Sequence, residues 1–216
     1  MTPIALDVFA DIACPWCFIG HRRLRAVLVE GPGAAFAWRH RAFELQPQLP
    51  PRGRPMDAFL AERFGSREAA AARLAGVAEQ AARSGVPYDA SAMLVAPNTR
   101  LAHRAVTLAR GQGFEAQALD ALYLAHFAEG LDVTDFATIV ERLADAGLPD
   151  PPALAARLAA GDGEEEVAED EAIGAQIGVR AVPLVVAGRR IVLRAAQDPA
   201  TYGRFLAHAI AATRAG

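Results

Sequence analysis

The alternation of apolar and polar positions predicts a strand, a helix and a second strand in the first 43 residues. Ile4 to Phe9 is a short apolar run typical of a buried strand, and Phe18 to Glu30 has apolar residues at helical spacing. From Phe36 to Phe43, apolar and polar residues alternate with period two, as in a second strand. A proline-rich cluster from Pro47 to Pro55 cannot continue either structure, so this unit ends there.

The stretch from Met56 to about Gln176 is rich in alanine and leucine at helical spacing, which predicts several packed helices. Glycine and proline interrupt it repeatedly, and these interruptions mark the expected helix ends. An acidic run from Glu164 to Glu171 suits the dipole at a helix start, and we expect it to form a solvated helix face.

The pattern changes again after Gly178. Pro183–Ala187 and Arg190–Leu193 are short β-branched segments on either side of Gly188, which predicts a hairpin. Pro199 then opens a final amphipathic helix.

The predicted order is strand, helix, strand, a helical insertion of about 120 residues, hairpin and helix. This order indicates an α/β fold. We expect residues 1–50 and 178–216 to form one unit and residues 51–177 to form an inserted helical domain.

Composition narrows the classes of function. The chain has 216 residues, 53% of them hydrophobic, which is enough to bury a substantial core. A net charge of -3 with scattered arginines disfavours nucleic-acid binding. No export signal and no long apolar run is visible, so we expect a cytoplasmic protein that does not cross a membrane. An exported protein whose signal had been removed would have the same sequence.

The two cysteines of the chain, Cys14 and Cys17, stand one helical turn apart in the motif Cys14-Pro15-Trp16-Cys17. Residues at this spacing share a helix face, and their Cα atoms fall within the roughly 4.4 to 6.8 Å that a disulfide requires. The motif lies where the first strand gives way to the first helix. There the helix dipole favours a thiolate, and Pro15 suits the first turn because it needs no hydrogen-bond partner.

Three other interpretations of the pair are weaker than redox chemistry. Buried cysteines often act as small apolar residues. However, the chain has only two cysteines, and chance would rarely place both of them at CxxC spacing. A zinc site needs about four ligands, and the chain has no second CxxC or His-x3-His pair, so we expect no metal within the chain and only an intermolecular site, less favoured still, would remain. A structural disulfide over four residues would constrain the unfolded chain very little.

A CxxC motif at the first strand-to-helix junction, with a proline opening the third strand, resembles the thioredoxin fold. The long helical insertion narrows this resemblance to the DsbA-like class, and further segments resemble its cytoplasmic FrnE-like subgroup of dithiol oxidoreductases. The matching segments are Asp11–Gly20, Phe43–Pro47, Asn98–Thr99 with Ala102–His103, Phe127–Gly130, and Gly178–Val179 with Val182–Pro183.

The resemblance implies thiol–disulfide exchange. Cys14, expected to be the more exposed, acts as the nucleophile, and Cys17 resolves the mixed disulfide. Pro15 and Trp16 tune and shield the motif. Val182 and Pro183, the latter matching the cis-proline of the family, hold the backbone of a substrate. No cofactor is implied beyond the Cys14–Cys17 disulfide.

The implied partners are thiols or disulfides, protein or small molecule. Glutathione is a co-substrate that the resemblance allows, and a homodimer is compatible with it. Whether the protein oxidises, reduces or isomerises depends on a reduction potential that the sequence does not contain.

Five polar residues form a second group of candidates. Asp11 is either an acid or base near the motif or, as we favour, a cap for the following turn. His21 shares the helix face of Cys17 and would stabilise a thiolate, although an exposed helix histidine is the commoner outcome. Glu44, Asn98 and His103 belong to the matching segments, and Asn98 is also a candidate helix N-cap.

The chain departs from the subgroup at Arg194-Ala195-Ala196-Gln197, where the subgroup reads Ser-Gly-Ala-Gln. Replacing that glycine restricts the backbone locally.

Two other functions compete with dithiol chemistry. One is a glutathione-dependent isomerase or transferase of the 2-hydroxychromene-2-carboxylate isomerase and kappa type, whose members typically carry a serine where Cys14 stands. The other is a chaperone module that uses an apolar groove beside the motif.

Overall fold

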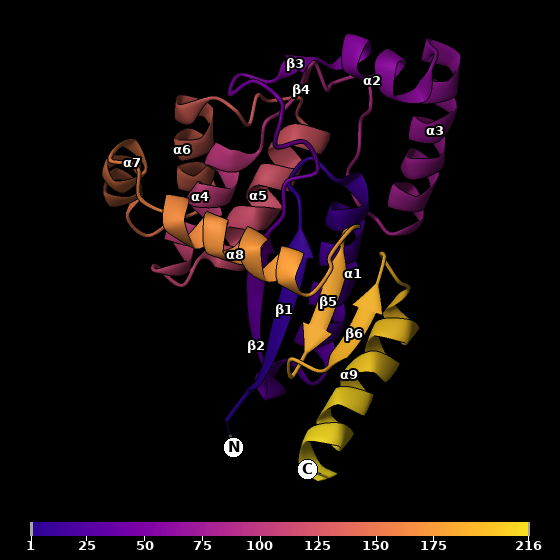
Figure 1. Ribbon diagram of the computed structural model, residues 1–216, viewed down its shortest axis with the longest axis vertical. Coiled ribbons are helices and arrows are strands. Elements are labelled where there is room, and N and C mark those ends of the chain that lie inside the picture. The colour runs from indigo at the N-terminus through magenta and orange to yellow at the C-terminus, as the bar shows by residue number, and fades with distance from the viewer. Residues whose placement is uncertain (1, 216) are drawn as a thin grey trace.

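Four strands from the two ends of the sequence form one mixed sheet (Figure 1). The computed structural model describes residues 2–215 and gives the strand order β2, β1, β5, β6. These strands are β1 (Ile4–Ala10), β2 (Phe36–Ala42), β5 (Leu184–Ala187) and β6 (Ile191–Arg194). β1 is parallel to β2 and antiparallel to β5, and β5 and β6 form the predicted hairpin.

Helices account for most of the remaining chain. They are α1 (Pro15–Glu30), α2 (Met56–Phe64), α3 (Arg67–Arg83), α4 (Arg100–Arg110), α5 (Glu115–Phe127), α6 (Phe136–Asp145), α7 (Pro151–Ala159), α8 (Glu164–Gln176) and α9 (Pro199–Ala215). A 3₁₀ turn covers Gly33–Ala35, and β3 (Arg54–Pro55) pairs with β4 (Val95–Ala96).

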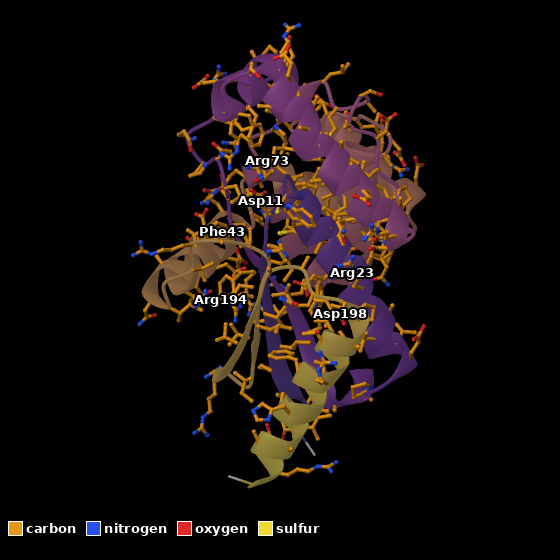
Figure 2. The ribbon with its side chains drawn as sticks, turned by 90° about the vertical axis from the view of Figure 1, so that its right-hand side faces the viewer. Asp11, Arg23, Phe43, Arg73, Arg194 and Asp198 are labelled. Carbon is orange, nitrogen blue, oxygen red and sulfur yellow. The ribbon has the colours of Figure 1, made fainter. Side chains whose placement is uncertain are left out.

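The sheet lies between two layers of helix. α8 crosses one face and contacts β2, and α1 packs with α9 on the other face (Figures 1 and 2). The helices α2 to α7 gather beyond the end of the sheet at which β1 finishes (Figure 1). The predicted α/β class, a thioredoxin fold with a large helical insertion, is confirmed.

One hydrophobic core joins the sheet to the insertion. It includes Leu6 and Val8 of β1, Phe18 of α1, and Leu119 and Tyr123 of α5, all of them buried. Helices α2 to α8 fall within the predicted insertion of residues 51–177. The division of the chain into two domains stays a prediction, because the core is continuous between them.

Helix α1 begins three residues earlier than the apolar pattern predicts, at Pro15 rather than Phe18. Proline suits this position because its fixed φ is already helical and the first-turn nitrogens have no partner within the helix. The cysteine motif is therefore part of the first turn of α1.

The acidic run of α8 contains a buried anchor, so our expectation of a solvated face is wrong at Asp170. This carboxylate is fully buried, accepts a hydrogen bond from Arg41 at 2.7 Å and one from the Ala42 amide at 3.2 Å, and lies 3.5 Å from Arg39. Glu165 and Glu169 of the same run are exposed, whereas Glu164 and Glu171 pair with Arg100. Asp170 ties α8 to β2. Periodicity could not reveal this, because its partners lie about 130 residues away in sequence.

Within the described part of the chain, no helix combines the length and apolar character needed to cross a bilayer.

We predict that Asp170→Ala destabilises the protein by about 3 kcal/mol, because breaking a buried ion pair leaves Arg41 without one of its two carboxylate partners. Glu169→Ala, an exposed neighbour on the same helix, should change stability by less than about 0.5 kcal/mol. Urea unfolding followed by circular dichroism measures both, and equal effects of the two variants would contradict the anchoring role.

Candidate active site

The first turn of α1 presents both cysteines. Cys14 is the N-cap residue, with an extended backbone, and its carbonyl accepts hydrogen bonds from the amides of Cys17 and Phe18 at 3.0 and 3.2 Å. The Cys14 amide in turn donates to the carbonyl of Asp11 at 3.1 Å. The turn before the helix is therefore closed by backbone hydrogen bonds, which hold the two thiols on one side of the helix start.

The segment that opens β5 lies against Cys14. The Val182–Pro183 peptide bond is cis, and the Cys14 thiol is 3.9 Å from the Val182 carbonyl oxygen, to which it donates. Gly20 of α1 allows this approach, because a Cβ at that position would lie 3.2 Å from Pro183 Cγ and 3.1 Å from the Tyr202 hydroxyl. Cys14, Val182 and Pro183, separated by about 168 residues in sequence, thus form one site.

Burial dominates the electrostatics of Cys17. Its side chain is enclosed by the core, and burial, reinforced by the neighbouring Cys14, raises the pKa of Cys17 well above its ordinary value. The favourable effect of a helix N-terminus on a thiolate does not overcome desolvation at this position. Cys17 is accordingly a protonated thiol in the reduced protein.

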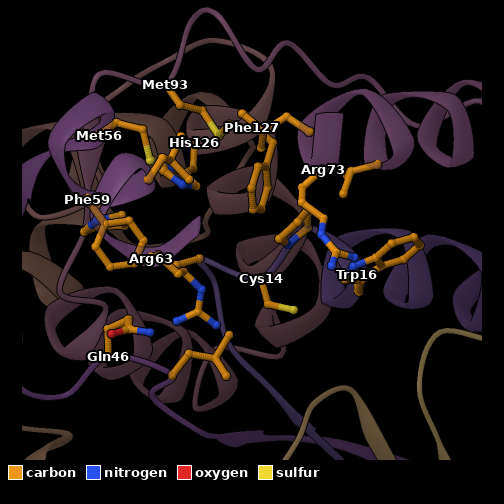
Figure 3. Close-up of a pocket in the computed structure, with 18 of the residues that line it drawn as sticks. Cys14, Trp16, Gln46, Met56, Phe59, Arg63, Arg73, Met93, His126 and Phe127 are labelled. Atoms are coloured by element: carbon orange, nitrogen blue, oxygen red, sulfur yellow. The ribbon is translucent and has the colours of Figure 1, made fainter. Parts of the chain in front are cut away.

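A cavity of about 560 Å³ opens in front of Cys14 (Figure 3). Cys14 and Trp16 line it, whereas Cys17 does not. By exposed fraction the two cysteines differ little, at 4% and 1%, so our expectation of a clearly more exposed Cys14 is only weakly met. What distinguishes them is access, since Cys14 borders open space and Cys17 faces the core. Trp16, 40% exposed, stands at the rim.

Asp11 and His103 meet beneath the motif in a buried polar chain. Asp11 accepts hydrogen bonds from the Ala13 amide at 3.1 Å and the Leu45 amide at 2.6 Å. His103 Nε2 lies 3.4 Å from Asp11 Oδ1, an ion-pair distance without hydrogen-bond geometry. On its other side, His103 Nδ1 is 3.1 Å from His40 Nε2.

The environment keeps Asp11 ionised. Burial acts to raise the pKa of Asp11, but the charge of the neighbouring His103 and the hydrogen bond from the Leu45 amide outweigh it and hold the pKa below its usual value. The favoured capping role is half right: Asp11 secures the turn through Ala13, yet the helix N-cap itself is Cys14. Asp11 also fastens the loop after β2.

His21 is buried, so our expectation of an exposed helix histidine is wrong. Its ring packs against Trp38 and Tyr123. Burial, together with the charges of Arg25 and Arg22, lowers the pKa of His21 to about 3. Although Asp120 is 3.8 Å away, that carboxylate is held by Arg22 at 2.5 Å, and His21 stays neutral at physiological pH. A neutral ring provides no charge to stabilise a thiolate.

Glu44 and Asn98 hold loops rather than the cysteines. Glu44 pairs with Arg100 at 3.1 Å, and burial nevertheless raises the pKa of Glu44. Asn98 donates to the Leu49 carbonyl at 2.9 Å and accepts from the Arg100 amide at 3.1 Å. The N-cap of α4 is Thr99, one residue after the one we expected. Asn98 therefore fixes the cavity wall at Leu49, and Glu44 ties the segment after β2 to the first residue of α4.

Several cavity residues carried no signal in the sequence: Arg63 of α2, Arg73 of α3, Tyr88 of the loop before β4, and His126 of α5. They come from four separate segments that converge only in the folded chain. Burial lowers the pKa of His126 to about 4, so it is neutral. Among the described residues, no three His, Cys, Asp or Glu side chains cluster as metal ligands would.

A family model described as a DSBA-like thioredoxin domain matches residues 5–207. The chain belongs to this DsbA-like family. A probable DsbA oxidoreductase from Streptomyces coelicolor has a similar solved structure, with 31% identity, a TM-score of 0.85, and coverage of 96% of this chain and 90% of that one. A search of the curated proteins gives no match.

Other solved structures of lower identity share the fold. A cytosolic disulfide reductase, DsbM, from Pseudomonas aeruginosa, solved with GSH, has 19% identity and a TM-score of 0.70 over 95% of this chain and 98% of that one. A 2-hydroxychromene-2-carboxylate isomerase has 15% identity and a TM-score of 0.65 over 97% of this chain and 95% of that one.

The departure from the FrnE-like pattern lies beside the site. Ala195, where the subgroup has glycine, has a φ of 62°, in the left-handed region that favours glycine. Its amide donates to the Pro183 carbonyl at 3.0 Å, and the Gln197 carbonyl accepts from Arg23 at 3.2 Å. The loop after β6 is thus fastened both to the start of β5 and to α1.

We predict that Ala195→Gly raises the free energy of unfolding by about 0.5 kcal/mol, because relief of the left-handed alanine exceeds the added chain entropy. Ala196→Gly, at a position without a positive φ, should lower it by about 0.5 to 1 kcal/mol. Thermal or urea unfolding measures both, and the same sign for the two variants would refute the backbone argument.

We predict that His21→Leu reduces the loss of stability on acidification. The folded-state pKa of His21, about 3, lies below the ordinary 6.5, so its contribution is full above pH 6.5 and is lost as the pH falls towards 3. Between pH 7 and 4.5 the variant should lose about 2 kcal/mol less than wild type in urea titrations. His208→Gln, an exposed histidine of α9, is the control, and an unchanged pH profile in His21→Leu would count against burial of a neutral ring.

Proposed function

We propose that this chain is a thiol–disulfide oxidoreductase in which Cys14 exchanges with substrate and Cys17 resolves the mixed disulfide. The observation that carries the proposal is the position of the Cys14 thiol: it borders an open cavity and the Val182 carbonyl, while Cys17 lies one turn behind it in the core. Membership of the DsbA-like family supports redox chemistry of this type.

In the reducing direction, the Cys14 thiolate attacks one sulfur of a disulfide R–S–S–R′, and R′–S⁻ leaves. Cys17 then loses its proton and attacks the Cys14 sulfur, so the bond to R breaks and the Cys14–Cys17 disulfide forms. Two electrons pass from the protein to the substrate, and the two protons end on the released thiols. The oxidising direction is the reverse.

The surroundings of Cys14 support both steps. Burial keeps Cys17 protonated in the reduced protein, so Cys14 is the thiol that attacks the substrate first. Val182 and Pro183 border Cys14 and offer backbone to an extended substrate, and Trp16 at the rim, after Pro15, shields the thiol. Asp11 remains the candidate acid or base, since its carboxylate is buried below the motif.

We further infer a member of the FrnE-like subgroup that acts in the cytoplasm, with glutathione as a co-substrate. The fold shared with a cytosolic disulfide reductase solved with GSH supports this inference. A homodimer is part of the same proposal.

The second candidate is a glutathione-dependent isomerase or transferase, favoured by the shared fold of the 2-hydroxychromene-2-carboxylate isomerase. The two functions make opposite demands on Cys14. Redox exchange needs a sulfur there, whereas the enzymes of the isomerase group typically carry a serine.

We predict that Cys14→Ser lowers the reduction of insulin disulfides and the oxidation of dithiol peptides to the uncatalysed background. Cys17→Ser should accumulate a mixed disulfide between Cys14 and the substrate, visible by mass spectrometry of the intact protein, because nothing resolves it. Retained redox activity in Cys14→Ser would refute the proposal. Glutathione-dependent isomerase or transferase activity in that variant would establish the alternative.

A further inference from the structure

We propose that the cavity in front of Cys14 is a binding site for a small molecule with an apolar, preferably aromatic, body and a carboxylate or similar acid group. Such a molecule, carrying a thiol or disulfide, would be the substrate class of the site. This step rests on the proposed function. A site for such small molecules would distinguish the chain from an oxidoreductase that binds only extended polypeptide.

The apolar part of the argument comes from the cavity wall. Its volume of about 560 Å³ lies within the roughly 300 to 1,000 Å³ typical of small-molecule sites. Met56 and Phe59 of α2, Met93, and Phe127 of α5 face the space around Cys14 (Figure 3). Aromatic and methionine side chains of this kind adapt to a flat apolar ligand.

The charge of the wall supplies the second part. Within residues 2–215, the cavity lining contains two arginines, Arg63 and Arg73, and no carboxylate. In Figure 3 the two guanidinium groups extend into the space on either side of Cys14. The local charge is therefore positive in a chain whose net charge is -3, which favours an anion.

These two arginines differ from the other arginines of α3. Arg67 pairs with Asp57 at 3.3 Å, and Arg83 pairs with Glu79. No carboxylate of the described chain lies within ion-pair distance of Arg63 or Arg73, and the Arg63 guanidinium lies 6.0 Å from the centroid of the Phe64 ring. Planar guanidinium groups without partners suit bidentate binding of a carboxylate.

An unpartnered hydroxyl adds an independent observation. Tyr88 lines the cavity, and its buried phenolic oxygen has no hydrogen-bond partner in the described structure. Burial raises the pKa of Tyr88 to about 12, so it stays a hydrogen-bond donor at physiological pH. A buried donor without a partner is costly, and an acceptor on a bound ligand would relieve that cost.

The chemistry of the substrate then follows the exchange already described. The acid group pairs with Arg63 or Arg73, the apolar body packs against the cavity wall formed by α2 and α3, and the sulfur reaches Cys14. A disulfide of this class takes two electrons from the Cys14 and Cys17 thiols and leaves as two thiols. A thiol reductant returns the protein disulfide to the dithiol.

The binding test uses the reduced protein and needs no redox turnover. Alkylation of Cys14 by iodoacetamide, a neutral reagent, is followed by mass spectrometry with 2-naphthoate or acetate present. We expect 2-naphthoate to slow alkylation at least about tenfold, acetate to have no effect, and the half-protecting concentration to rise at least about tenfold in the Arg63→Gln/Arg73→Gln double variant. No protection, or equal protection in the double variant, would overturn the proposal.

The control variant is Arg67→Gln, which removes one positive charge from α3 outside the cavity. 2-Naphthoate should protect Cys14 of this variant as it protects Cys14 of the wild type. Because Arg63 and Arg73 are exposed, their replacement should leave the thermal midpoint unchanged, and this is checked for each variant.

A redox test separates this proposal from the function on which it rests. The pre-reduced protein is mixed with an anionic aromatic disulfide, 5,5′-dithiobis(2-nitrobenzoate), and with a neutral one, 4,4′-dithiodipyridine. We expect the rate constant for the anionic disulfide, divided by that for the neutral one, to fall at least about tenfold in the double variant. The same ratio should be unchanged in Arg67→Gln. Failure of wild type to reduce either disulfide would refute the oxidoreductase, whereas reduction of both with an unchanged ratio would remove the anion site alone.

Discussion

The close packing of the first turn of α1 against the start of β5 is the contact on which the candidate site depends. Gly20 leaves the space that Pro183 occupies, and this brings the Val182 carbonyl to the Cys14 thiol. The loop containing Ala195 secures the same contact from the far side through the Pro183 carbonyl. If these backbones moved apart, Cys14 would remain at a helix start but would lose its backbone neighbour.

The helical insertion supplies most of the wall of the cavity in front of Cys14. The core that runs from β1 through α1 to α5 holds the insertion against the motif, and α2 and α3 place their apolar side chains around Cys14. The two cysteines face different surroundings. Cys17 faces the core and stays protonated, whereas Cys14 faces a cavity whose wall carries positive charge. One helical turn thus separates a thiol that borders open space from one that faces the core.

Polar residues were the hardest to interpret from the sequence, because their roles depend on partners distant along the chain. Asp170 sits in an acidic run that reads as solvated, yet it anchors α8 to β2. His21 and Asp11 are both near the motif, but burial removes the charge of the first, whereas His103 and the Leu45 amide preserve the charge of the second. Desolvation and hydrogen bonding decide whether such a side chain is charged, and the spacing of residues along the sequence reveals neither of them.

The sequence by itself determined the order of the elements, the place of Cys14 and Cys17 at a strand-to-helix junction, and the long helical stretch between two halves of a sheet. These follow from local rules, since periodicity, proline and glycine act over a few residues. Only the tertiary structure decided that Val182 would border Cys14, that Asp11 would meet His103, and that Arg63 and Arg73 would share a cavity. These contacts join segments that are tens to hundreds of residues apart in sequence, and only the burial and packing of the folded chain bring them together.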